Sequence, residues 1–246
     1  MISDKETTVR RSIVSAVAII TASLSLAGCI PASIITPPPD IASSSPTATP
    51  TPKAVDLLAS AFSKAQAAKY VHIVGDQSMT ASSSLVDSRG TLDNNQFDTK
   101  LESARQGEFH VISISGSTWV KPVDFSAILT LDIPQENVGK WIKSPNSWAE
   151  KSLHFSTKTI LSAAVSSFPA QETQRNRLAV ETVTHKEKKA WKITRPTAVE
   201  KVAAIISADG KDQLLALERD GRTLNFSDWN NARPVTPPAA NEVTAI

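Results

Sequence analysis

The stretch Tyr70-Val71-His72-Ile73 marks the point at which the hydrophobic pattern of this chain changes from a helical to a strand period. Before it, residues 53–68 place apolar side chains three or four positions apart, at Val55, Leu58, Ala59, Phe62 and Ala65. This spacing predicts an amphipathic helix, because such residues share one side of a helix. From Tyr70 onward apolar and polar residues alternate, which predicts β-strands. We therefore expect a helix with one apolar side, followed by a β-sheet.

Several later segments are short, rich in β-forming residues and separated by turn residues, as expected of neighbouring antiparallel strands. They are residues 97–101, 109–115, 117–121, 178–184, 190–194 and 223–229. The predicted turns between strands are Asp87–Gly90, Gln106-Gly107, Asp209-Gly210 and Asp220-Gly221. Asp-Gly between alternating apolar residues is a strong hairpin signal. Lys186-Glu187-Lys188-Lys189 is predicted to be a solvated hairpin tip.

Helices are predicted in the middle of the chain. Residues 123–131 and 135–139 form short pieces between prolines, and residues 158–168 form a stronger helix that Pro169 stops. Its apolar stripe consists of Ile160, Leu161, Ala164, Val165 and Phe168. The predicted fold class is α+β, with one antiparallel sheet and with the helices at 54–68 and 158–168 on a single face.

The N-terminal segment is typical of an export signal, and it leads to the only cysteine, in Leu26-Ala27-Gly28-Cys29. This tetrapeptide resembles the bacterial lipoprotein signal, in which the cysteine thiol takes a diacylglyceryl group and the bond between Gly28 and Cys29 is cut. The alternative is a transmembrane helix or an ordinary signal with an incidental thiol. However, the apolar run at residues 13–26 is shorter than the roughly 17 to 25 residues that a bilayer core requires. Arg10-Arg11 leaves twin-arginine export as a further alternative.

The predicted domain organisation has four parts. Residues 1–28 are the signal peptide, and residues 29–53 are a tether rich in Pro, Ser and Thr, too poor in apolar residues to fold alone. In a polyproline II conformation the tether reaches about 70 Å. Residues 54–235 form one domain, and residues 236–246 form a tail that we expect to be disordered.

Charge and motifs exclude several classes of function. The formal net charge of +2 falls to +1 without residues 1–28, so bulk charge does not predict nucleic-acid binding. The four histidines, His72, His110, His154 and His185, lack the spacing of metal ligands, and no hydrolase or phosphate-binding motif is present. We therefore expect no catalysis, cofactor or metal. The tryptophans are predicted to be sheet residues first, with sugar stacking or a membrane interface as the alternative; they are Trp119, Trp141, Trp148, Trp191 and Trp229.

The order of these features resembles a known family. The segments that carry the resemblance are the Cys29 signal, the leading helix, Gly116–Lys121, Gly139–Lys143, the helix that ends at Phe168, and the closing Asp-Gly hairpins with Asn225–Ser227. Residues 54–235 are similar to the actinobacterial lipoproteins of the LppX/LprG type, whose domain resembles the lipoprotein carrier LolA. The resemblance implies a strongly curved antiparallel sheet, a half-barrel, with helices packed on its concave face. It also implies that the space between them holds the acyl chains of lipids or glycolipids.

The candidate ligand pocket follows from this resemblance. Its expected lining residues are Val71, Ile73, Val111, Phe125, Ile128, Leu129, Ile160, Leu161, Ala164, Val165 and Phe168. The alternative is that these residues form a filled core, because periodicity identifies an apolar side and not the space behind it.

The predicted function is that of an exported lipoprotein, anchored to the outer side of the cell membrane through Cys29, which binds or carries a lipid or glycolipid. The alternative is a non-catalytic envelope scaffold or accessory interaction protein with a closed core. We expect a monomer.

Overall fold

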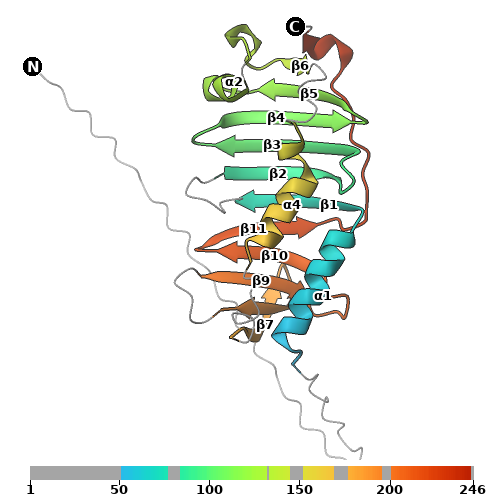
Figure 1. The fold of residues 1–246 in the computed structure, drawn as a ribbon, viewed down its shortest axis with the longest axis vertical. Coiled ribbons are helices and arrows are strands. Elements are labelled where there is room, and N and C mark those ends of the chain that lie inside the picture. Colours follow the sequence, from blue (N-terminus) through green and yellow to red (C-terminus); the bar gives the residue numbers. More distant parts are fainter. Residues whose placement is uncertain are drawn as a thin grey trace, which may run out of the picture. The chain divides into compact units, whose positions relative to one another are not determined.

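The computed structural model describes residues 51–76, 84–131, 133–144, 152–168, 177–195 and 201–244. The predicted signal peptide, Cys29 and most of the tether lie outside these ranges. Within them, one 12-stranded sheet forms the body of the domain (Figure 1). No helix in the described ranges combines the length and the apolar character needed to cross a bilayer.

The strands of the first half are β1 (Tyr70–Asp76), β2 (Ser84–Thr91), β3 (Gln96–Ser103), β4 (Gly107–Ile114), β5 (Ser117–Pro122) and β6 (Trp141–Lys143). Those of the second half are β7 (Ala179–His185), β8 (Lys188–Thr194), β9 (Val202–Ser207), β10 (Leu214–Arg219), β11 (Arg222–Ser227) and β12 (Val243–Thr244). The helices are α1 (Ala54–Ala67), α2 (Phe125–Leu131) and α4 (Thr157–Ser166), and the short 3-10 helices are η1 (Gln135–Asn137), η3 (Leu153–Phe155) and η4 (Ala240–Glu242).

The sheet consists of two antiparallel meanders joined at the middle. Their order is β12-β6-β5-β4-β3-β2-β1-β11-β10-β9-β8-β7. The chain builds β1 to β6 outward to one edge, returns through α4, and starts again at the other edge with β7. The last hairpin strand, β11, then pairs with β1, with His72 opposite Ser227. Only the pairing of β12 with β6 is parallel among the described strand pairs, so the predicted antiparallel sheet is correct except at this edge.

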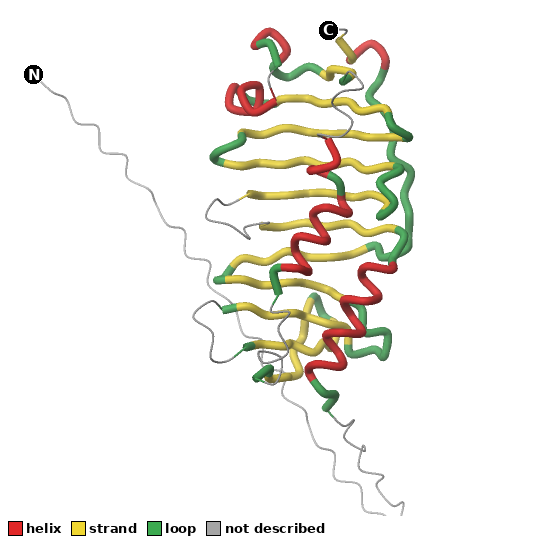
Figure 2. Tube along the Cα trace, in the orientation of Figure 1, coloured by secondary structure: helices red, strands yellow, loops and turns green. Residues whose placement is uncertain are grey.

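Helices α1 and α4 lie across the same face of the sheet, as predicted (Figures 1 and 2). Their apolar residues share one buried cluster with strand residues from β1, β2 and β8 to β11. We call this side of the sheet the covered face and the opposite side the open face. Helix α4 begins after Ser156, whose side chain accepts a hydrogen bond from the backbone N–H of Thr159 at 3.2 Å, as expected of an N-cap.

The apolar side of α1 differs by about one position from the prediction. Its buried residues are Leu57, Leu58, Ala61 and Ala65, whereas Ala59 is exposed and Val55 is half-buried. The predicted stripe of α4 is correct: Ile160, Leu161, Ala164, Val165 and Phe168 are all buried.

The prediction of a turn at Asp87–Gly90 is wrong, because these residues lie inside β2. Their side chains are held by neighbouring strands: Asp87 pairs with His72 on β1, and Arg89 pairs with Asp98 on β3. Gly90 lies against Phe97, and a Cβ at residue 90 would come within 2.6 Å of the Phe97 Cβ. The turn lies instead at Leu92–Asn95, where Asn94 has a φ of 63°.

The other predicted turns are confirmed. Gly210 and Gly221 have φ values of +79° and +82°, which only glycine adopts without strain. Lys186 and Glu187, also at positive φ, form the tip between β7 and β8.

Part of the segment predicted to be a disordered tail, residues 236–246, forms η4 and β12 at the edge of the sheet, and the preceding Val235 also contacts the sheet. Val235 is buried with Ile112 and Trp141, and its backbone N–H donates to Gln96 at 3.3 Å. Val243 then lies beside Trp141 as β12 adds to the sheet. These contacts join the tail to residues of β3, β4 and β6.

Candidate ligand-binding face

The α4 stripe lies against apolar side chains of the covered face. Ile160, Leu161 and Ala164 are at most 2 % exposed and share one cluster with Val71 and Ile73, both 0 % exposed. The structure therefore brings seven of the eleven predicted pocket residues together: Val71, Ile73, Ile160, Leu161, Ala164, Val165 and Phe168.

The other four predicted residues lie toward the β6 edge. Val111 is 1 % exposed and packs with Phe97, Phe109 and Ala127 of α2 in a second cluster. The register across β2, β3 and β4 places this cluster on the covered face too. Ile128 is buried, whereas Phe125 is 53 % exposed. The side chain of Leu129 is outside the described part of the structure.

Helices α1 and α4 meet through aromatic side chains. The Phe62 ring of α1 contacts the Phe168 ring at the end of α4 edge to face, with 5.7 Å between the centroids and 82° between the planes. Such aromatic pairs contribute about 0.5–1.5 kcal/mol beyond the apolar area that they bury. A small hollow of about 20 Å³ adjoins Phe168, Val202 and Leu217 at this end of α4.

The opposite end of α4 docks through buried hydroxyl groups. Ser88 of β2 hydrogen-bonds to Thr157 at 2.9 Å and to Thr99 of β3 at 2.7 Å. The Thr99 hydroxyl lies 2.8 Å from the backbone oxygen of Phe155, to which it donates. We call the hydroxyl groups of Ser88, Thr99 and Thr157 the seam. The sequence analysis did not identify the seam, although Ser88 and Thr99 each lie between covered-face residues of their strand that carry no polar side chain.

Two of the larger hollows lie on the surface of the described domain. One of about 310 Å³ lies between the C-terminal end of α1 and the β9–β10 turn, with Lys64, Leu214 and Trp229 in its wall. Another of about 330 Å³ includes Val74 and Leu85, which are 39 % and 51 % exposed, together with Lys100. Both are open to solvent and lie away from the α4 stripe.

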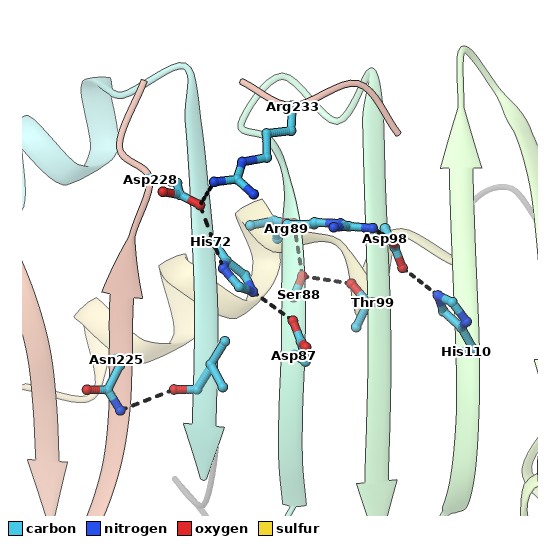
Figure 3. Close-up of polar contacts among 12 residues, drawn as sticks. His72, Asp87, Ser88, Arg89, Asp98, Thr99, His110, Asn225, Asp228 and Arg233 are labelled. Atoms are coloured by element: carbon cyan, nitrogen blue, oxygen red, sulfur yellow. Dashed lines mark hydrogen bonds and ion pairs between the residues drawn. The ribbon is translucent and has the colours of Figure 1, made fainter. Parts of the chain in front are cut away.

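The open face of β1 to β4 carries a polar network (Figure 3). Asp98 lies at its centre and is 8 % exposed. It accepts two hydrogen bonds from Arg89, at 3.1 and 2.6 Å, and forms a further short hydrogen bond with His110. Burial opposes ionisation of Asp98, but the hydrogen bonds and charges of His110 and Arg89 outweigh it and hold the pKa of this carboxyl below its usual value. The Trp141 ring covers His110, with 4.7 Å between the ring centroids.

A second histidine lies at the β1 end of the network. His72 Nε2 is 2.8 Å from Asp87 Oδ1, and its Nδ1 is 3.9 Å from Asp228, which is in turn 3.8 Å from Arg233. These contacts tie the segment after β11 to β1 and β2. Asp87 and Arg89 on β2 and Asp98 on β3 alternate with residues of the covered face, as expected within strands.

Comparison with known proteins gives structural neighbours only, because no family model and no curated protein matches the chain. LppX is among the solved structures to which the chain is similar. The Mycobacterium tuberculosis lipoprotein LppX matches with a TM-score of 0.42 and 14 % identity over 74 % of this chain and 99 % of LppX. The sequence analysis predicts this resemblance. A conserved protein of Thermus thermophilus matches with a TM-score of 0.35 and 12 % identity over 78 % of this chain and 99 % of its own. MucB, solved in complex with MucA, matches with a TM-score of 0.31 and 10 % identity over 76 % of this chain and 58 % of MucB.

The remaining histidines and the tryptophans are dispersed over the described domain. His154 is exposed in η3 and His185 ends β7. Among the described residues, no three His, Cys, Asp or Glu side chains are grouped as a metal ion requires. Trp119, Trp141 and Trp191 lie on strands as predicted, Trp229 follows β11, and Trp148 is outside the described ranges.

Proposed function

We propose that this protein is an exported lipoprotein, anchored to the outer side of the cell membrane through Cys29, that binds or carries a lipid or glycolipid. The ligand's acyl chains lie between α4 and the covered face, with the sheet as a curved half-barrel of the LolA type and the helices on its concave side. No residue performs chemistry in this function. Each buried methylene of an acyl chain contributes about 0.8 kcal/mol to binding.

The observation that carries the proposal is the apolar layer between α4 and the sheet. It joins the α4 stripe to strand residues from both meanders, Val71 and Ile73 of β1 and Ile206 of β9 among them. Helix α4 is held at one end by hydroxyl groups and at the other by the Phe62–Phe168 contact.

A second candidate is a scaffold or accessory protein with a closed core. Protein atoms alone leave Ile160 and Ala164 only 1 % exposed, which favours this candidate. The two candidates differ in what an enlarged side chain at residue 164 does, because Ala164 lies in the middle of the stripe.

The decisive experiment compares Ala164→Trp with Ala163→Trp. Ala163 is exposed on the same helix and makes the control, since it receives the same side chain away from the sheet. If ligand occupies the layer, the Ala164 variant stays folded and loses the lipid that native mass spectrometry detects in wild type purified from a lipid-containing host. The Ala163 variant keeps its lipid.

The closed-core candidate predicts the reverse. Overpacking at residue 164 then costs roughly 1–3 kcal/mol, which a thermal melt registers as a lower melting temperature. No lipid accompanies the wild-type protein in that case. This pair of results contradicts the lipid carrier and supports the scaffold.

A further inference from the structure

Five exposed lysines gather at one corner of the domain, from three segments that lie far apart in the sequence. We call this group the lysine corner; it consists of Lys64, Lys186, Lys188, Lys189 and Lys211. The backbone N–H of Ala208 donates to Lys189 O at 3.2 Å, which joins the β9–β10 turn to the β7–β8 tip. Lys64 Nζ donates to Lys211 O at 2.8 Å, which joins α1 to the same turn.

The corner has an excess of positive charge. Its carboxylates are Glu187, Asp209 and Asp212, so five lysines face three acids. Asp212 is 2.9 Å from Lys64, and Asp209 is 3.7 Å from Lys211. Within the described ranges, no such ion pair engages the three lysines around the β7–β8 tip.

The surface of the corner is hollowed. A hollow of about 410 Å³ is lined by Lys188, Lys189, Ser207 and Asp209 and reaches Gln213. Gln213 also lines the hollow that contains Lys64, Lys211 and the indole of Trp229. Lysines and an aromatic side chain around one hollow suit a surface that presents anionic groups over apolar material.

The proposed lipid anchor at Cys29 supports a membrane as the occupant. Helix α1 starts near the β7 edge of the sheet (Figure 1). Ala54, at this start, packs against the main core cluster. The chain from Cys29 to the described domain is long enough to reach about 70 Å. Such a tether keeps the domain near the bilayer but does not orient it, so surface charge decides which side faces the lipid.

We propose that the lysine corner docks on anionic lipid headgroups and orients the tethered domain with its β7–β8 tip toward the bilayer. This inference rests on the proposed lipid anchor and is independent of whether a ligand occupies the layer under α4. The attraction of each lysine to an anionic leaflet adds to that of the others, and salt screens this attraction.

The test uses the mature chain from residue 29 with Cys29→Ser, so that no attached lipid contributes to binding. Sedimentation with vesicles compares pure phosphatidylcholine with a mixture containing about 30 % phosphatidylglycerol. Binding is expected only to the mixture, with loss at about 0.5 M NaCl. Lys188→Glu/Lys189→Glu reduces the affinity by at least ~thirtyfold. Lys100→Glu/Lys140→Glu, at exposed positions toward the other end of the sheet, leaves it unchanged.

Other outcomes overturn the proposal. Equal binding to neutral vesicles indicates apolar insertion, and equal loss in both double variants indicates a diffuse charge effect. Displacement by about 10 mM inorganic phosphate, but not by NaCl of the same ionic strength, indicates a site for soluble phosphate. Absence of vesicle binding by wild type means that the corner does not orient the domain. Fatty-acid labelling at Cys29 in cells reports separately on the anchor.

Discussion

Asp98 joins three strands of the sheet through one carboxylate. Its carboxylate pairs with Arg89 of β2 and with His110 of β4. The ring of Trp141 from β6 covers the histidine. Because Asp98 is nearly buried, removal of its charge leaves its partners without their counter-ion in a place where water replaces it poorly. The contact between His72 and Asp87 differs, since the Asp87 side chain is 53 % exposed.

Asp98→Asn is expected to lower the free energy of unfolding by about 2 kcal/mol at pH 7. Because the folded-state pKa of Asp98 is depressed, its contribution is fully present above the ordinary Asp pKa of about 3.9. It is lost as the pH falls through the depressed folded-state pKa, so the difference between wild type and variant shrinks in acid. Urea unfolding at several pH values measures this difference.

Asp87→Asn serves as the control for this prediction, because its exposed pair with His72 is expected to contribute at most about 1 kcal/mol. Equal losses in the two variants, or a difference for Asp98→Asn that grows below pH 4, would show that the network is not held by the Asp98 charge.

Helix α4 is fixed to the sheet by two kinds of contact, apolar packing along its length and hydrogen bonds at its start. Its stripe is apolar, whereas its first residue, Thr157, hydrogen-bonds to Ser88 in a site where both are 0 % exposed. A buried hydroxyl without a partner costs about 1–3 kcal/mol. The seam therefore holds the start of α4 in one position on β2.

Ser88→Ala is expected to destabilise the domain by about 1–3 kcal/mol, since it leaves the Thr157 hydroxyl without this partner. Amide hydrogen exchange should show faster opening at the start of α4 than in β1. The control is Ser162→Ala on the exposed side of α4, which changes stability little because alanine favours helix. Protection at α4 that is unchanged in the Ser88 variant would rule out an anchoring role for the seam.

The element that the sequence analysis misplaced, β2, shows why local patterns fail there. Asp87-Ser88-Arg89-Gly90 has the composition of a turn, and no apolar residue in it signals a strand. Each of its side chains is nevertheless satisfied by a neighbouring strand or by α4, and the absence of a side chain at Gly90 leaves room for Phe97. The partners that make this segment a strand lie outside the segment.

At the scale of the whole molecule, the proposed lipid anchor depends on a single residue, Cys29. Cys29→Ala is expected to abolish fatty-acid incorporation, because no other thiol exists in the chain. The variant should remain uncleaved or leave the membrane fraction, since stable attachment requires more than one acyl chain. Metabolic labelling with a fatty acid, followed by membrane sedimentation, measures both effects.

Cys29→Ser provides a second non-lipidated variant for this measurement and should behave like the alanine variant. Incorporation of label into either variant, together with sedimentation like that of wild type, would contradict the lipoprotein signal at Leu26–Cys29.

Local patterns in the chain predicted the elements that depend on near neighbours. The period of two at Val71 and Ile73, the stripe from Ile160 to Phe168 and the Asp-Gly hairpins are set by residues within a few positions of each other. The arrangement of the two meanders is different, because it depends on pairs such as Asn225 and Val74, which are 151 positions apart. The strand at Asp87–Gly90 and the parallel pairing of β12 with β6 likewise depend on contacts with residues outside the segment itself. Such contacts stabilise a segment only after the rest of the sheet has formed, so they leave no periodic signal in the segment itself, and the tertiary structure alone decides them.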